Sequence, residues 1–159
     1  MNQLLDKVGV EFPSDLDYIP AIRKFISDIA VINKFPRRFA FRTEVIIDEI
    51  CSNAVLHGSQ QLDSKIGIEC LIFSDRIELF IENDVGDLAK VENLAKRISE
   101  EEDKKENVTS KNGRGLRIVK LLSNKINLIR LEKKNTRIRI VKYREDKPAF
   151  VLMTDSVIS

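Results

Sequence analysis

The chain has 159 residues, the size of one domain, and its 43% hydrophobic and 33% charged residues are the balance of a soluble globular protein. A formal net charge of +2 is too small to indicate a nucleic-acid or membrane partner. The two cysteines, Cys51 and Cys70, have apolar neighbours and no metal-ligand spacing, which excludes a disulfide framework and favours small core residues.

No apolar run approaches the length that crosses a membrane, and the N-terminal residues carry acidic side chains without a continuous apolar stretch. We therefore expect a cytoplasmic protein with neither a membrane anchor nor a secretory signal. The sequence contains no internal repeat and no sign of a second domain. We expect one domain over residues 1–145 and a C-terminal tail over residues 146–159.

The first half of the chain predicts a strand followed by two helices. Alternating apolar residues indicate the strand, a Pro-Ser-Asp turn ends it and supplies a helix N-cap, and apolar residues at three- and four-residue steps indicate the helices. A proline in the first turn and a glycine after the last residue mark the ends of the second helix. The strand is predicted over residues 7–12 and the helices over 16–31 and 36–57, with Gly58 as the C-terminal cap.

The second half of the chain predicts four strands and two more helices. Two alternating segments joined by Ser74 and Asp75 indicate a hairpin. Amphipathic spacing indicates the helices, and a further alternating pair closes the domain. The predicted strands cover residues 65–73, 76–83, 125–131 and 136–143, and the predicted helices cover 88–98 and 116–123.

This order of elements predicts an α+β fold, a two-layer sandwich in which a mixed, mainly antiparallel sheet is covered on one face by helices. The elements do not form a string of βαβ units, so the sequence argues against a Rossmann fold. The apolar part of the tail, residues 149–153, fits an edge strand or a docking segment, and the sequence leaves both open.

The helical segment over residues 46–58 carries two unlike faces. Apolar residues fill one face, while Glu49 and Asn53 lie four residues apart on the other, with Asp48 and Ser52 beside them. A carboxylate one turn from an amide can coordinate hydrated magnesium and orient a nucleophile. The same spacing is also that of an ordinary solvated helix face, so this stripe alone does not establish a site.

The segment over residues 99–115 is the least hydrophobic part of the chain. Such a charge run is typical of a solvated linker, yet a segment of this length inside a compact domain is often a lid over a site. Gly113 and Gly115 at its end fit a phosphate-binding helix start or simple loop punctuation. Arg137, Arg139 and Lys142 make the last strand basic, as a solvent-facing strand often is, but no aromatic stacking platform accompanies them, which argues against nucleic-acid binding.

The order of these motifs carries a resemblance to a known superfamily. The motifs are Glu49-x-x-x-Asn53-Ala54-x-x-His57, Asn83-Asp84-Val85-Gly86 and Asn112-Gly113-Arg114-Gly115-Leu116. Over residues 7–143 this succession resembles the histidine-kinase-like ATPase superfamily, which includes gyrase, a heat-shock chaperone, sensor histidine kinases and MutL. The resemblance implies the Bergerat ATP-binding fold. The segments FPSDLDYIPAIRKFI and DEICSNAVLHG look most like the anti-sigma-factor serine kinases.

The resemblance gives the residues of the helix motif specific roles. Asn53 would ligate Mg²⁺ through its side-chain oxygen, with the metal bridging the nucleotide phosphates. Glu49 would act as a general base or polarise the attacking hydroxyl. His57 would lie near the phosphates, although it also fits a plain residue at the negative end of the helix dipole.

The glycine motif would bind the phosphates. Gly113 and Gly115 would allow close approach of the backbone, Arg114 would add positive charge, and Leu116 would complete the segment. Arg114 fits a solvent-exposed position equally well.

The adenine end departs from the pattern of the superfamily. Members carry Asp-x-Gly-x-Gly, which by spacing points to Asp84 and Gly86, but Leu88 replaces the second glycine. Strand alternation instead places Asn83 on the face of Ile81 and turns Asp84 away unless a bulge intervenes. Either Asn83 or Asp84 can accept a hydrogen bond from the adenine amino group, and the sequence leaves both open.

The resemblance implies an ATP- and Mg²⁺-dependent serine/threonine protein kinase that sequesters a sigma factor and phosphorylates an anti-anti-sigma antagonist. The irregular adenine motif keeps a second hypothesis open, a non-catalytic nucleotide-sensing or protein-binding switch of the same fold. A detached histidine-kinase catalytic domain is a weaker third, because the sequence shows no paired-helix dimerisation domain. The kinases that the chain resembles are often dimers, which leaves a homodimer open.

Overall fold

The computed structural model describes residues 3–58, 61–84, 88–99, 111–130 and 135–144. Its strands are β1 (Leu4–Pro13), β2 (Lys65–Phe73), β3 (Arg76–Asp84), β4 (Lys125–Arg130) and β5 (Asn135–Tyr143). Its helices are α1 (Ile19–Ile32), α2 (Arg37–His57), α3 (Leu88–Ser99) and α4 (Lys111–Leu122), with a 3₁₀ turn η1 (Leu16–Tyr18) before α1. All the predicted strands and helices are therefore present.

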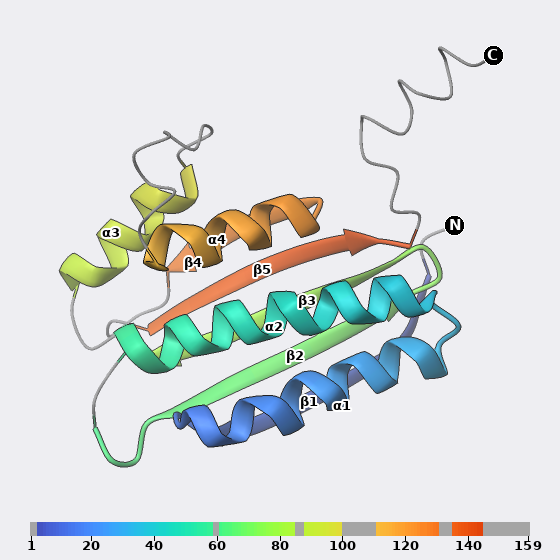
Figure 1. Ribbon diagram of the computed structural model, residues 1–159, viewed down its shortest axis with the longest axis horizontal. Coiled ribbons are helices and arrows are strands. Elements are labelled where there is room, and N and C mark those ends of the chain that lie inside the picture. Colours follow the sequence, from blue (N-terminus) through green and yellow to red (C-terminus); the bar gives the residue numbers. More distant parts are fainter. Residues whose placement is uncertain (1–2, 59–60, 85–87, 100–110, 131–134, 145–159) are drawn as a thin grey trace, which may run out of the picture.

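The strands form one sheet in the order β1-β2-β3-β5-β4, and α1, α2 and α4 lie across one side of it (Figure 1). We call this side the covered face and the opposite side the open face. The prediction of a two-layer α+β sandwich is confirmed. The four strand pairings in the described part of the chain are all antiparallel, so the sheet is simpler than the mixed sheet that the sequence predicted.

The core lies between the covered face and the helices. Strand alternation sends every second side chain of β2, β3 and β5 towards the helices, and these side chains are mostly isoleucine. Two isoleucines of α2, Ile46 and Ile47, are fully buried against them, and Phe35 packs on Phe39 with ring centroids 4.5 Å apart. Cys51 and Cys70 are fully buried and free, as the sequence predicted.

Two helix starts differ from the prediction by a few residues. The first helix begins at Ile19 because Leu16–Tyr18 form the 3₁₀ turn, which the Asp15 carboxylate caps by accepting the Asp17 N–H at 2.9 Å. The last helix begins at Lys111, five residues before the predicted start, so the glycine pair lies inside α4 and does not precede it. Glycine is a poor helix former, which is why the sequence pattern favoured a loop there.

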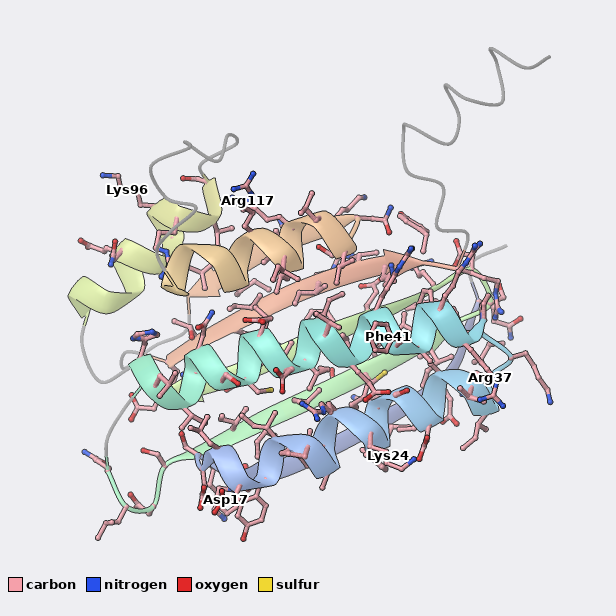
Figure 2. All side chains as sticks on the ribbon, viewed as in Figure 1. Asp17, Lys24, Arg37, Phe41, Lys96 and Arg117 are labelled. Atoms are coloured by element: carbon pink, nitrogen blue, oxygen red, sulfur yellow. The ribbon has the colours of Figure 1, made fainter. Side chains whose placement is uncertain are left out.

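The outer surface of the helix layer is polar with scattered apolar residues. Lys24 on α1 and Phe41 on α2 are exposed, and Arg117 on α4 is partly exposed (Figure 2). The helices in the described ranges include none that is long and apolar enough to span a membrane. The tail over residues 146–159 and residues 100–110 of the charged segment lie outside the described residues, so their predicted roles stay predictions, whereas residues 111–115 of that segment belong to α4.

Candidate functional site

The polar stripe of α2 faces a neighbouring helix and is not simply solvated. Glu49 and Asn53 are both half-buried, and α4 packs beside α2 (Figure 1). Asp48, the neighbouring carboxylate, instead accepts a hydrogen bond from Arg23 of α1 at 2.6 Å. The stripe thus separates into one carboxylate that ties α1 to α2 and another that points towards α4.

Gly115 of α4 lies directly against this stripe. A Cβ built on Gly115 would overlap Oε2 of Glu49 and would lie 3.6 Å from Nδ2 of Asn53. Because Gly115 has no side chain, the Glu49 carboxylate lies directly against α4, one turn from the start of this helix and so near the positive end of its dipole. The structure therefore brings together Glu49, Asn53 and Gly115, three residues that the sequence assigned to one site.

The other residues of the glycine motif belong to the same helix. Gly113 and Arg114 lie in the first turn of α4, and the structure describes their backbone but not the Arg114 side chain. Leu116 is buried, with 4% of its surface exposed, which suits packing between α4 and its neighbours. The phosphate-binding roles predicted for these residues stay predictions.

A second cluster forms where β3 ends and β5 begins. Asn83 and Thr136 are partners across these two strands, and the Thr136 hydroxyl donates a hydrogen bond to Oδ1 of Asn83 at 3.1 Å. The register is regular through Asp84, so no bulge intervenes, and Asn83 shares the covered face with Ile81 while Asp84 turns to the open face. The alternation argument for Asn83 is therefore confirmed.

Gly58 joins the end of α2 to this cluster. Its N–H donates to the Ala54 carbonyl at 3.0 Å, which confirms its predicted role as the C-terminal cap. Its φ of −84° needs no glycine. The need is steric: a Cβ would overlap the Ala54 carbonyl and would lie 2.9 Å from Nδ2 of Asn83 and 3.1 Å from the Asp84 carbonyl. Sequence reasoning did not assign Gly58 to the site, because this close approach has no signal in a local pattern.

The two clusters lie along one helix. Asn53 and Gly58 are five residues apart on α2, which is about 7.5 Å along its axis. His57, between them, is the exposed last residue of α2, close to the negative end of the helix dipole. Gly86 and the charged segment lie outside the described residues.

The described residues offer few metal ligands of their own. No group of three or more His, Cys, Asp and Glu side chains capable of holding a metal ion occurs among them. This donor set does not fit an all-protein cage, but it fits Mg²⁺, which is commonly held by one or two protein oxygens and by the phosphates of a nucleotide. Asn53, with its amide half-buried beside Glu49, is the residue that suits this role.

The thiols of the chain are poor candidates for a nucleophile. Burial, with a smaller contribution from Asp48, raises the pKa of the Cys51 thiol to about 12. Burial, with a smaller contribution from Asp6, raises the pKa of the Cys70 thiol to about 12. Both thiols therefore stay protonated at neutral pH. The groups that the candidate site offers are the Glu49 carboxylate, amide and hydroxyl groups, and backbone N–H groups.

Two comparisons with known proteins agree with this geometry. Residues 12–142 match the family model described as the histidine kinase-like ATPase domain, and this range includes both clusters. One curated relative, the "Serine-protein kinase RsbW" of Bacillus pumilus (strain SAFR-032), is 25% identical over 84 residues. That match covers 51% of this chain and 52% of the relative, so the chain spans about half the length of the curated relative that it matches.

Proposed function

The chain belongs to the family of the histidine kinase-like ATPase domain, and from this premise we propose that it is an ATP-binding anti-sigma factor with serine/threonine protein kinase activity. The observation that carries the proposal is the contact of Gly115 with Glu49 and Asn53. It joins a carboxylate, an amide and the start of a helix in one place, which suits a reacting phosphate and its metal.

The base of the nucleotide would lie at the second cluster. We assign adenine recognition to Asn83, whose Oδ1 faces Thr136 and whose Nδ2 faces Gly58. An amide offers both an acceptor and a donor, so it can accept from the adenine amino group. Asp84 is a weaker candidate because its side chain lies on the open face, although its backbone carbonyl lies close to Gly58.

The phosphates would lie along α2 towards Glu49. When bound, Mg²⁺ neutralises phosphate charge, and Asn53 would hold it through its side-chain oxygen. Glu49 would accept the proton of a serine or threonine hydroxyl as that oxygen forms a bond to the γ-phosphorus. The bond between the γ-phosphorus and the bridging oxygen breaks, and ADP leaves with that oxygen.

The partners follow from the proposed activity. The phosphorylated protein would be an anti-anti-sigma antagonist, and the sequestered protein a sigma factor. The similarity to a protein named as a serine-protein kinase supports the kinase part of this proposal. A homodimer is part of the same hypothesis, and the molar mass in solution, measured by light scattering, tests it.

Nucleotide binding is tested by calorimetric titration with ATP and Mg²⁺. We expect saturable binding between micromolar and millimolar concentrations. Asn83→Ala should weaken binding by about tenfold, since a buried polar contact to a ligand contributes on the order of 1.4 kcal/mol. Glu92→Gln, which alters an exposed carboxylate on α3, is the control and should bind as the wild type does. No heat of binding at millimolar ATP would contradict the proposal.

Catalysis is tested by transfer of labelled γ-phosphate to a candidate antagonist protein. Glu49→Gln keeps the shape of the side chain but removes the base, and we expect a loss of at least about a hundredfold in rate. Asp48→Asn is the matched control, because Asp48 lies next to Glu49 on α2 but pairs with Arg23. Equal rates for the wild type and Glu49→Gln would rule out the role of Glu49.

A second function, the non-catalytic switch, is favoured by one observation. By spacing the acid of the superfamily motif corresponds to Asp84, whose side chain lies on the open face, while Asn83 occupies the covered face at the end of β3. A switch would bind ATP in the titration and would transfer no phosphate to any antagonist tested. The two assays together therefore separate the two functions.

A further inference from the structure

A basic surface lies where α1 passes into α2, at the end of α2 opposite to the proposed nucleotide site. From Ile29 to Thr43 the chain carries four cationic side chains and no acidic one. Lys34, Arg37 and Arg38 are exposed and form no ion pair with the described residues. Phe41 lies one turn after Arg37 on α2 and is 65% exposed (Figure 2). We call Lys34, Arg37, Arg38 and Phe41 the basic corner.

The folded chain gains little stability from the residues of the basic corner. Lys34 has a φ of 68°, the one positive φ among the described non-glycine residues, and a side chain disfavours that conformation. Arg37 and Arg38 occupy the first turn of α2, where the helix dipole favours acidic residues, and no side chain caps this turn. Local features that cost stability, gathered in one place, indicate a surface with a function.

The described chain ends beside the basic corner. β5 reaches the end of the sheet at which α1 passes into α2 (Figure 1). The Arg144 guanidinium donates to the carbonyls of Lys34 at 2.7 Å and Asn33 at 3.3 Å, and it stacks over the Phe35 ring at 3.8 Å. Arg144 is the last described residue. The C-terminal tail therefore starts about one side-chain length from Lys34.

The sequence of the tail complements the basic corner. Glu145 and Asp146 come first, then Lys147, and an apolar run over residues 149–153 follows. The side chains of residues 145–159 carry a net formal charge of −2, against +4 for residues 29–43. The order also matches, because the acids start next to the cations and the apolar run comes later, as Phe41 does on α2.

The length of the tail allows this contact. Nine extended residues, from 145 to 153, span up to about 30 Å. Arg37 and Phe41 are only about 6 Å apart along the axis of α2. A segment joined to its surface by a short linker has an effective concentration of about millimolar, so weak ion pairs and an apolar contact lead to appreciable occupancy. An unlinked acidic polypeptide lacks this advantage.

We propose that residues 145–153 of this chain dock on the basic corner, with Glu145 and Asp146 against Lys34 and Arg37 and the apolar run against Phe41. An acidic segment of another protein would bind there only by displacing the tail. Asn53 lies about 18 Å from Phe41 along α2, so the proposal does not depend on the proposed nucleotide site.

The test uses the full chain, labelled with ¹⁵N and carrying a nitroxide spin label on the tail at Ser156→Cys. Cys51 and Cys70 are buried, so the label reacts with the new thiol. We expect the unpaired electron to broaden the amide signals of residues 37–41 and to leave that of Asp63, beyond the far end of α2, sharp. High salt should weaken the broadening of residues 37–41 because it screens the ion pairs.

Two variants with matched controls identify the contacts. Phe41→Ser should lower the ratio of docked to undocked tail by at least about tenfold, while Leu62→Ser, which removes another exposed apolar side chain, should leave it unchanged. Arg37→Glu should lower the same ratio by about threefold, while Lys96→Glu on α3 should leave it unchanged. An acid at position 37 suits the helix dipole, so this loss does not come from a weakened fold.

Four results would overturn the proposal. Sharp signals throughout residues 37–41 would show that the tail lies elsewhere. Broadening of β1 or β4 instead would assign the tail to an edge of the sheet as an added strand. Broadening that survives both Phe41→Ser and Arg37→Glu would exclude these contacts. Broadening in a mixture of spin-labelled chain and ¹⁵N-labelled chain without the spin label would place the tail on a second copy of the chain.

Discussion

Each face of the sheet buries one charged side chain, but the two faces satisfy that charge differently. The buried charged residues of the described chain are Glu78 on the open face and Lys142 on the covered face. Glu78 lies between two arginines, with Arg76 Nε at 2.7 Å and Arg139 Nη2 at 2.9 Å. Lys142 lies above the Phe39 ring at 5.3 Å and donates to the Leu122 carbonyl at 2.7 Å, at the end of α4.

This difference shows what each face contributes. The covered face excludes water and gains stability from close-packed isoleucine and phenylalanine, so polar groups there must find a partner or cost free energy. The open face holds its buried carboxylate, Glu78, between two arginines, and aromatic rings lie under arginines, as Phe73 does under Arg76 at 3.8 Å. The buried charge of the open face is therefore satisfied by ion pairs within the sheet, without a layer of helices.

The largest effect on stability is expected from removing a large buried side chain between the covered face and the helices. Phe39 is fully buried, and Phe39→Ala should lower the free energy of unfolding by about 3–5 kcal/mol because it leaves a cavity. Phe80→Ala, on the half-buried open face, is the matched comparison and should cost about 1–2 kcal/mol. Urea unfolding measures both variants, and equal losses would contradict the difference between the faces.

The contribution of the open-face ion pairs to stability is tested at Glu78. Glu78→Gln leaves Arg76 and Arg139 without their shared carboxylate, and we expect a loss of about 3 kcal/mol. Glu82→Gln removes a carboxylate on the same strand and face that forms no ion pair with the described residues, and it should change stability by less than about 0.5 kcal/mol. If the two variants unfold at the same urea concentration, the pairs around Glu78 contribute little.

The buried lysine of the covered face should make stability depend on pH. Burial, and to a smaller degree the charge of Arg42, lowers the pKa of Lys142 from 10.5 to about 8. Between pH 8 and 10.5 the unfolded chain binds more protons at this residue, so the stability of the wild type should rise with pH. Relative to Lys142→Met, the wild type should gain about 2 kcal/mol across this window.

The measurement is a set of unfolding curves of the wild type and Lys142→Met, recorded at several pH values that extend from about one unit below this window to about half a unit above it. Since other lysines titrate in both proteins, only the difference between the two curves reports on Lys142. If the free energies of unfolding of the two proteins change in parallel with pH, burial does not lower the pKa of Lys142.

The smallest effect on stability, with the clearest effect on function, is expected at Gly115. Gly115→Ala gains helix propensity but pushes against the flexible end of Glu49, so stability should change by less than about 1 kcal/mol. If the kinase proposal holds, phosphotransfer should fall by about tenfold because Glu49 is displaced. In a Glu49→Gln background the same substitution should cause no further loss, and an additive loss would contradict this coupling.

The secondary structure could be read from the sequence because it follows local patterns. Alternating apolar residues predicted the hairpin of β2 and β3, and the Pro-Ser-Asp turn predicted the end of β1, both within a residue or two. The start of α4 was wrong because it depends on tertiary packing. Gly113 and Gly115 oppose a helix by propensity, but α4 lies beside α2 and its glycine contact with Glu49 is part of that packing.

The sequence by itself determined which residues are candidates: Glu49 and Asn53 share a helix face, and Asn83 shares a strand face with Ile81. Those relations follow from the periods of the helix and the strand. Only the tertiary structure decided that Gly115 meets Glu49, that Thr136 bonds to Asn83, and that Gly58 must be small beside Asn83. These contacts join segments far apart in the chain, and no local period relates their residues.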